Sequence, residues 1–176
     1  MQESQAPKAF YKMIELLVLD VDGCLTSGTI TYTESGDEIK SFNVKDGLAI
    51  ATWIRLGKKV AIITGRKSKI VQRRMSELKV THIHQGIRAK KEKLDEILKL
   101  EGLEYSQVAA IGDDLNDYLM LKAVGNSFTP QNGIKYIRDS VDVVLSSNGG
   151  EGAVREMIEM IILKDGLSER FLKEWL

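Results

Sequence analysis

The residues in this sequence that could do chemistry come directly after short apolar runs. After residues 16–19, 60–63 and 108–111 stand, in turn, Asp20 and Asp22; Thr64, Gly65 and Arg66; and Asp113, Asp114 and Asp117. Each run has the length and the apolar character of a strand that is buried in a parallel sheet. Ligand sites in such sheets form at the carboxyl ends of the strands. These polar side chains are therefore predicted to meet at one edge of the sheet.

Carboxylates that gather at one sheet edge repel one another, and they coexist only with a metal ion or with raised pKa values. All the candidate ligands carry oxygen, which suits Mg²⁺ rather than zinc or copper. A carboxylate can attack phosphorus and form an aspartyl-phosphate, and a second acid can protonate the leaving oxygen. Taken singly, the residues other than Asp20 and Asp22 are better explained as turn residues, helix caps or solvated side chains. Taken together, they predict phosphoryl transfer that depends on Mg²⁺.

The segments that must position these residues alternate between strand-like and helix-like patterns. Strands are predicted at residues 16–19, 60–63, 81–84, 108–111 and 140–145, and helices at 46–56, 67–78, 90–100, 116–123, 152–163 and 168–176. This alternation is typical of a doubly wound, Rossmann-like parallel α/β sheet. Residues 29–33 and 38–42 flank a turn-like segment and are predicted to form a protruding β-hairpin.

Length and composition indicate one globular domain, predicted over residues 10–176, with residues 1–9 loose. The sequence has 25 basic and 25 acidic residues, a balance that gives no support for a nucleic-acid or anionic membrane partner. Its single cysteine, Cys24, excludes an intrachain disulfide. No apolar run approaches the roughly 20 residues of a membrane span, and no hydrophobic signal region is found at the N-terminus. We therefore predict a cytoplasmic protein.

The ordered set of motifs resembles the haloacid dehalogenase superfamily of phosphatases. The motifs are Asp20-x-Asp22-Gly23, Thr64-Gly65-Arg66, Lys90 and Gly112-Asp113-Asp114-x-x-Asp117. The resemblance implies that Asp20 is the nucleophile and Asp22 the acid/base. It also implies that Thr64 and Lys90 bind the phosphoryl group. The residues implied at the metal are Asp20, the backbone carbonyl of Asp22 and Asp113 as Mg²⁺ ligands, with Asp114 and Asp117 supporting the ion or its waters.

Within this superfamily, the sequence is similar to the 3-deoxy-D-manno-octulosonate 8-phosphate phosphatases. The similarity lies in the short chain, the hairpin after the first motif, residues 42–47 (FNVKDG) and residues 149–156 (GGEGAVRE). Those enzymes serve lipopolysaccharide synthesis, lack a separate cap domain and are typically tetramers. The resemblance implies a small anionic sugar-phosphate substrate, contacted by Asp22, Asn43, Val44, Lys45, Asp46, Gly47, Thr64, Gly65, Arg66, Arg74 and Lys90.

The substrate itself stays open between two sugar phosphates. Several members of the family carry Arg four residues after the glycine that matches Gly47, where this sequence has Ala51. A nonulosonate 9-phosphate is therefore an alternative substrate. An alternative of another class is a receiver-like phospho-aspartate switch, but Asp22 would supply the hydrolytic group that a long-lived switch avoids. Residues 66–93 hold ten basic and two acidic residues, a balance that would attract an anionic substrate.

The predicted hairpin favours a homotetramer. Its Ile30, Tyr32, Ile39 and Phe42 supply more apolar surface than one small hairpin should expose, and its strand edges lack partners. Pairing with hairpins of other subunits would bury that surface. The alternative is a hairpin that folds over its own domain as a lid. In an assembly, Arg155 would be able to reach a substrate carboxylate.

Overall fold

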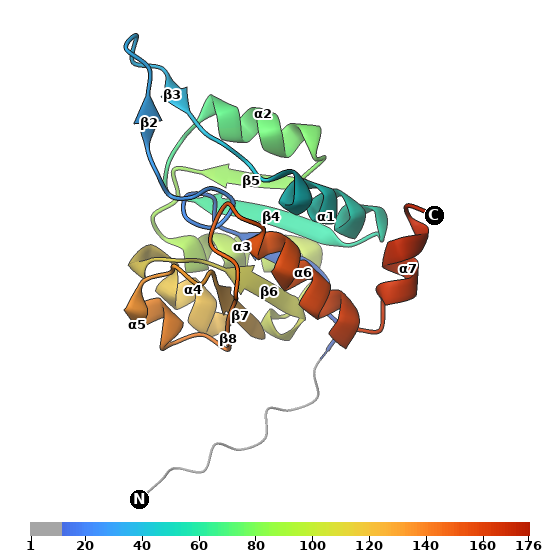
Figure 1. The fold of residues 1–176 in the computed structure, drawn as a ribbon. Coiled ribbons are helices and arrows are strands. Elements are labelled where there is room, and N and C mark those ends of the chain that lie inside the picture. Colours follow the sequence, from blue (N-terminus) through green and yellow to red (C-terminus); the bar gives the residue numbers. More distant parts are fainter. Residues whose placement is uncertain (1–11) are drawn as a thin grey trace, which may run out of the picture.

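The computed structural model describes residues 12–176, so the predictions for residues 1–9 and for the first two residues of the domain lie outside the described part. A six-stranded sheet has the order β5-β4-β1-β6-β7-β8, and all its neighbouring strands are parallel (Figure 1). Its strands are β1 (Leu16–Leu19), β4 (Lys59–Thr64), β5 (His82–Gln85), β6 (Val108–Ile111), β7 (Asn126–Thr129) and β8 (Val143–Val144). The doubly wound fold is thereby confirmed.

Helices cover both faces of this sheet (Figure 1). They are α1 (Val44–Arg55), α2 (Lys69–Glu77), α3 (Lys90–Glu101), α4 (Tyr118–Ala123), α5 (Lys135–Arg138), α6 (Ala153–Lys164) and α7 (Ser168–Lys173), with 3₁₀ turns η1 (Tyr105–Gln107) and η2 (Leu115–Asp117). Strand β1 shows why its run is wholly apolar. Leu17 and Leu19 pack with α1, α2, α6 and α7, whereas Leu16 and Val18 pack with α3, α4 and α5. Both faces of the strand are buried, as expected at the centre of a parallel sheet.

Strand β1 is also the point where the winding of the sheet reverses. The chain runs from β1 to β4 and β5 on one side, and then returns to β6, β7 and β8 on the other side. Loops that leave β1 and its two neighbours therefore diverge, and a crevice opens at their carboxyl ends. The motifs after residues 19, 64 and 111 all lie at this crevice.

The predicted hairpin is present and projects from the domain (Figure 1). Its paired strands are β2 (Thr31–Tyr32) and β3 (Glu38–Ile39), which are antiparallel and shorter than predicted. Ile30, Tyr32 and Ile39 are about half exposed. Phe42 differs from the prediction because it is partly buried against the main core.

Strand β7, helix α5 and the 3₁₀ turn η1 were not predicted from the sequence, and β8, like β2 and β3, is shorter than expected. Strand β7 was missed because Asn126, Ser127 and Thr129 interrupt the apolar pattern. Its register beside β6 places Phe128 next to Ile111. The four-residue helix α5 was also missed, and β8 covers only two residues of the strand predicted at 140–145. None of the helices in residues 12–176 combines the length and apolar character needed to cross a membrane.

Candidate active site

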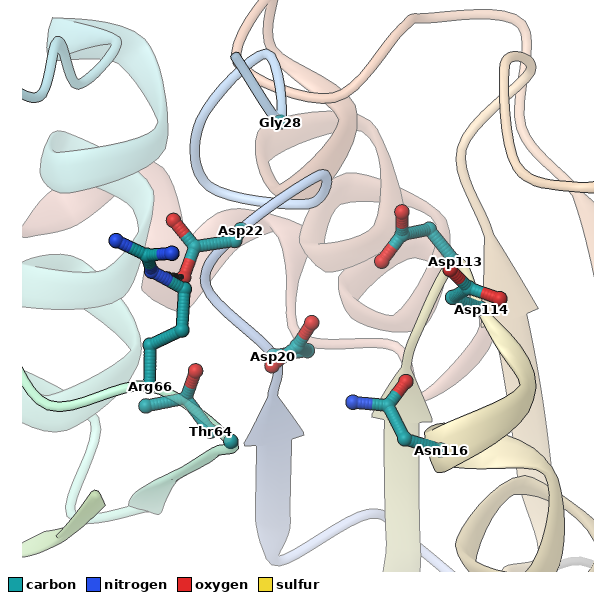
Figure 2. Close-up of a pocket in the computed structure, with 9 residues that line it drawn as sticks. Asp20, Asp22, Gly28, Thr64, Arg66, Asp113, Asp114 and Asn116 are labelled. Atoms are coloured by element: carbon teal, nitrogen blue, oxygen red, sulfur yellow. Dashed lines mark ion pairs between the residues drawn. The ribbon is translucent and has the colours of Figure 1, made fainter. Parts of the chain in front are cut away.

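A pocket of 260 Å³ opens at the carboxyl ends of β1, β4 and β6 (Figure 2). Residues from three separate motifs line it, as the strand pattern predicted. They are Asp20, Asp22, Gly28, Thr64, Gly65, Arg66, Asp113, Asp114 and Asn116. The sequence analysis did not assign Gly28 and Asn116. Asn116 lies inside the last acidic motif, so its position alone could have indicated it.

Lys90 lies beside the pocket at the start of α3 and binds two carboxylates. Its Nζ donates to Oδ1 of Asp20 at 2.8 Å and to Oδ1 of Asp117 at 2.5 Å. All three side chains are almost completely buried. Burial alone would lower the pKa of Lys90, but the charges of Asp20 and Asp117 raise it above the usual range. Lys90 is therefore a permanent cation at the end of β1.

One lysine does not balance the carboxylates of this site. Burial, followed by the charge of Asp117, raises the pKa of Asp20 to about 6. Burial, followed by the charge of Asp20, raises the pKa of Asp113 to about 7. At neutral pH the pocket therefore holds negative charge that a further cation would stabilise.

The donor set fits a hard divalent cation. Ligand atoms of Asp20, Cys24 and Asp113 lie within 4.8 Å of one another. Burial raises the pKa of the Cys24 thiol well above its usual value, and its Sγ lies 3.9 Å from Oδ1 of Asp113. A protonated thiol is a poor metal ligand, so the carboxylate oxygens remain as the donors. Oxygen donors of this kind suit Mg²⁺.

Close backbone packing fixes the first motif loop. A Cβ atom on Gly23, whose φ is +96°, would lie 2.1 Å from Oδ2 of Asp113. A Cβ atom on Gly149 would lie 1.7 Å from the carbonyl oxygen of Gly23, and the N–H of Gly150 donates to the carbonyl of Cys24. The glycines of the GGEG segment thus allow its backbone to pack directly against the loop between Asp20 and Cys24.

Asp117 organises the last motif from within. Its Oδ2 accepts hydrogen bonds from the backbone N–H groups of Asp113 at 3.1 Å and Asp114 at 3.3 Å. Asp114 caps η2 by accepting from the N–H of Leu115. The Asp117 carboxylate therefore joins Lys90 to the loop that carries Asp113, which is a structural role beside the metal candidates.

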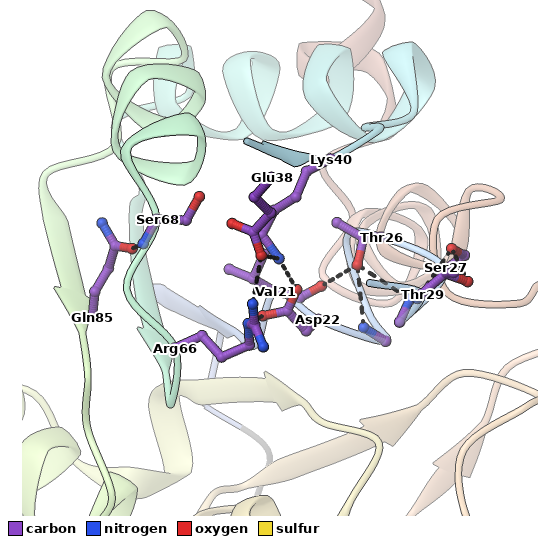
Figure 3. A network of polar contacts seen from close by, with 12 residues as sticks. Val21, Asp22, Thr26, Ser27, Thr29, Glu38, Lys40, Arg66, Ser68 and Gln85 are labelled. Carbon is purple, nitrogen blue, oxygen red and sulfur yellow. Dashed lines mark hydrogen bonds and ion pairs between the residues drawn. The ribbon is translucent and has the colours of Figure 1, made fainter. Parts of the chain in front are cut away.

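A network of charges connects the hairpin with the pocket (Figure 3). Nζ of Lys40, directly after β3, donates to Oδ1 of Asp22 and lies 3.5 Å from Oε1 of Glu38. The same Glu38 oxygen accepts from Nη2 of Arg66 at 2.5 Å. Nε of Arg66 lies 3.8 Å from Oδ2 of Asp22. Lys40 and Glu38 were not recognised from the sequence, because both lie in a hairpin that was assigned to assembly.

Several of the predicted substrate contacts do not line the pocket of this chain. Besides Lys90, which lies next to the pocket, they are Asn43, Val44, Lys45, Asp46, Gly47 and Arg74. Asn43 caps α1 by accepting from the N–H of Lys45 at 2.8 Å, and its amide donates to the carbonyl of Gly150. Arg74 on α2 packs against Gly47, where a Cβ atom would meet Nη2 at 2.2 Å. Val44 is 78% exposed and points to solvent. Their substrate contacts stay predictions.

Asp46, another predicted substrate contact, lies in a buried environment outside the pocket. Its side chain is buried between α1 and the start of α6, and Oδ1 accepts from the N–H of Arg155 at 2.7 Å. Its Oδ2 is buried and has no hydrogen-bond partner within residues 12–176, and burial raises the pKa of the Asp46 carboxyl to about 6. The side chain of Arg155 pairs with Glu159 at 2.6 Å, and it lines a separate pocket with Lys45. Asp46 therefore caps α6 from a neighbouring helix.

Known proteins resemble this chain in sequence and in structure. A family model described as haloacid dehalogenase-like hydrolase matches residues 83–158. The 3-deoxy-D-manno-octulosonate 8-phosphate phosphatase of Haemophilus influenzae is 39% identical over 158 residues, which is 90% of this chain and 88% of that one.

Two solved structures extend the comparison. The phosphatase of the same name from Moraxella catarrhalis, in complex with a magnesium ion, a phosphate ion and a KDO molecule, has a TM-score of 0.89 and 39% identity. The aligned region spans 93% of this chain and 94% of the Moraxella catarrhalis chain. The cobalt-bound form from Haemophilus influenzae has a TM-score of 0.83 and 38% identity, covering 87% and 90%. These findings confirm the resemblance indicated by the motifs.

Proposed function

This chain belongs to the haloacid dehalogenase-like hydrolases, in the family of the 3-deoxy-D-manno-octulosonate 8-phosphate phosphatases, and on that premise we propose that it hydrolyses this sugar phosphate. The products are 3-deoxy-D-manno-octulosonate and inorganic phosphate. The observation that carries the proposal is the meeting of Asp20, Asp22, Thr64 and Asp113 in one pocket beside Lys90. This is the arrangement that hydrolysis through an aspartyl-phosphate requires.

The reaction proceeds in two steps on the residues of this pocket. A carboxylate oxygen of Asp20 attacks phosphorus, and the bond between phosphorus and the sugar oxygen breaks. Asp22 gives its proton to that leaving oxygen. Asp22 then takes a proton from water, whose oxygen attacks phosphorus and releases phosphate, so that the Asp20 carboxylate is restored. Lys90 and the hydroxyl of Thr64 bind phosphoryl oxygens.

Mg²⁺ is the proposed cofactor. Asp20, the backbone carbonyl of Asp22 and Asp113 would hold it. The raised pKa values of Asp20 and Asp113 support this assignment, because burial first and the neighbouring carboxylates second make a bare negative charge unfavourable there, and a bound cation would relieve both. When bound, the ion neutralises the oxygens of the transferred phosphoryl group. The magnesium and cobalt of the related structures are consistent with an oxygen-rich site.

A screen of phosphate release tests the proposed activity. The panel contains 3-deoxy-D-manno-octulosonate 8-phosphate, a nonulosonate 9-phosphate and simpler sugar phosphates, each with Mg²⁺ or with excess chelator. We expect the octulosonate ester to give the highest kcat/KM and chelation to abolish turnover. A higher kcat/KM for the nonulosonate ester would assign the alternative substrate. Full turnover in chelator would remove the metal from the mechanism.

A homotetramer in the cytoplasm completes the proposal. The exposed apolar side chains of Ile30, Tyr32 and Ile39 support assembly, because hairpins of other subunits would cover them. Light scattering measures the mass directly. We expect Ile30→Lys with Tyr32→Lys to dissociate the assembly, while Leu163→Lys, at an exposed position on α6, leaves the mass unchanged. A fully active monomer at micromolar concentration would contradict assembly.

A further inference from the structure

Lys40 is a buried lysine that the established family motifs do not include. It follows β3, on the strand of the hairpin that returns to the domain, and its side chain is only 2% exposed. Lysine is almost never buried without a partner. Its two carboxylate partners in the described residues are Glu38 and Asp22, and Asp22 also lines the pocket (Figure 3). Lys40 therefore connects the hairpin directly to the proposed acid/base.

The contacts of Asp22 show how this connection works. Nζ of Lys40 donates to Oδ1 of Asp22. Oδ2 of Asp22 lies 3.8 Å from Nε of Arg66, which is beyond hydrogen-bonding distance. One oxygen is thus anchored, and the other is left to exchange a proton with the leaving group. Glu38 holds both cations in place, because its Oε1 contacts Nζ of Lys40 and Nη2 of Arg66.

Orientation is decisive for a general acid. Its carboxyl must lie within hydrogen-bonding reach of the leaving oxygen, and a displacement of about 1 Å can cost about 10²-fold in rate. Asp22 lies on a loop, and none of its own backbone neighbours is found to bond its carboxylate within the described residues. The hairpin residue Lys40 supplies the contact that the loop lacks.

We propose that Lys40 is a positioning residue that holds the Asp22 carboxyl toward the leaving oxygen. The hairpin then serves the reaction as well as assembly. This inference rests on the proposed function, because it requires Asp22 to protonate a leaving group. The proposal predicts that loss of Lys40 lowers kcat/KM for esters whose leaving group must be protonated, and leaves kcat/KM nearly unchanged for esters whose leaving group need not be.

The test compares two phosphate esters in the full-length protein with Mg²⁺. The sugar phosphate leaves as an alkoxide and needs the acid, whereas p-nitrophenyl phosphate leaves as a stable phenolate and needs it little. We expect Lys40→Met to lower kcat/KM on the sugar phosphate by about 10- to 100-fold and on the aryl ester by only a few-fold. An equal loss on both esters, or no loss on either, would overturn the proposal.

A second measurement asks whether Lys40 acts through Asp22. In an Asp22→Asn background the acid is already absent, so adding Lys40→Met should cause no further loss on the sugar phosphate. A multiplicative loss in the double variant would overturn the proposal. Where Lys40→Met does not fold, Lys40→Gln keeps a donor of similar reach. For Lys40→Gln we then expect a smaller loss of kcat/KM than for Lys40→Met, and we expect it on the sugar phosphate alone. An equal loss on both esters would overturn the proposal.

Lys58 offers a matched control. It is also buried, and its Nζ donates to the carbonyl of Ile14 at 2.6 Å and to Glu15 at 2.9 Å, at the other end of the sheet from the pocket. Lys58→Met should lower stability without changing the ratio between the two esters; a changed ratio would show that general destabilisation explains the Lys40 result. If the wild type cleaves other alkyl phosphates but not the octulosonate ester, only the proposed substrate fails. The comparison then uses the accepted alkyl ester.

Discussion

Asp20 and Asp46 are two buried carboxyl groups whose pKa values burial raises to about 6, yet they lie in different surroundings. Asp20 faces a pocket that it shares with Asp113, and Nζ of Lys90 donates to the Asp20 carboxylate. Asp46 lies buried between α1 and α6, where one oxygen accepts from the N–H of Arg155 and the other has no hydrogen-bond partner in the part of the chain that the structure describes. The same shift in pKa thus arises at a site open to ligands and at one closed to them.

The difference shows why a raised pKa alone does not identify a catalytic group. A metal ion that enters the pocket can neutralise the excess negative charge around Asp20, because the carboxylate of Asp113 lies close to that of Asp20. Asp46 has no such route, and only a proton can relieve its unpartnered oxygen. The charge of Asp46 is instead favourable toward the first turn of α6, where the backbone N–H groups have no acceptor within the helix itself and the N–H of Arg155 donates to Asp46. Access, and not pKa, separates the two roles.

The largest effect should come from replacing each carboxylate with its amide. Asp20→Asn removes the nucleophile, and we expect kcat/KM to fall by at least about 10³-fold. Asp46→Asn keeps an oxygen that accepts from Arg155, so most of the activity should remain. Phosphate release at saturating Mg²⁺ measures both. Comparable losses in the two variants would remove the distinction between open and closed carboxylates.

Lys90, the lysine beside the pocket, should also contribute to the free energy of unfolding. Lys90→Met leaves Asp20 and Asp117 buried without their cation, and we expect the free energy of unfolding to fall by about 3–5 kcal/mol. The control is Lys91→Met at the next position, whose exposed pair with Asp95 should contribute far less to stability. Urea unfolding compares the two, and equal losses would show that the buried pair carries no special weight.

Magnesium binding should separate the two regions by its pH dependence. Asp20 and Asp113 bind protons with pKa values of about 6 and 7 in the metal-free protein. Protons therefore compete with the metal as the pH falls through this range. At about 100 times Kd, we expect Mg²⁺ to add about 2.7 kcal/mol to the free energy of unfolding at pH 8 and far less at pH 5.

Variants at the two kinds of carboxylate control this measurement of the unfolding free energy. Asp113→Asn should abolish the effect of Mg²⁺ at every pH, because it removes a proposed ligand. Asp46→Asn should leave the effect intact, since the metal does not reach that side chain. A Mg²⁺ effect that does not vary between pH 5 and pH 8 would contradict competition by protons.

The smallest effect concerns Asp46 itself. Its pKa is raised from 3.8 in the unfolded chain to about 6 in the folded protein, so the folded state binds the proton more tightly. The resulting stability is fully present below about pH 4 and is lost as the pH rises through 6. Asp46→Asn lacks this titration, and we expect its advantage over the wild type to grow by about 2 kcal/mol between pH 4 and pH 8. Denaturant melts at both pH values check this, and a constant difference would contradict it.

Local sequence patterns alone were enough to predict the sheet apart from β7, and the principal residues of the pocket. Strands such as β1 are short, wholly apolar and followed at once by polar residues, because they are buried on both faces and end at the crevice. Asp20, Asp22, Thr64 and Asp113 could be assigned to one edge on this basis. The relation is local: a strand end fixes the position of the next few residues.

Only the tertiary structure decided the partners of residues that lie far apart in the chain. Lys40 meets Asp22 through the fold of the hairpin, and Asp46 meets the N–H of Arg155 109 positions later. Strand β7 exists because β6 supplies a ladder beside it, although three of its four residues are polar. The periodicity of a sequence determines which face of an element is buried, but not which residue of another element will lie against that face. Pairings of that kind depend on how the loops return the chain, and they determine whether a buried carboxylate meets a pocket, a lysine or a helix end.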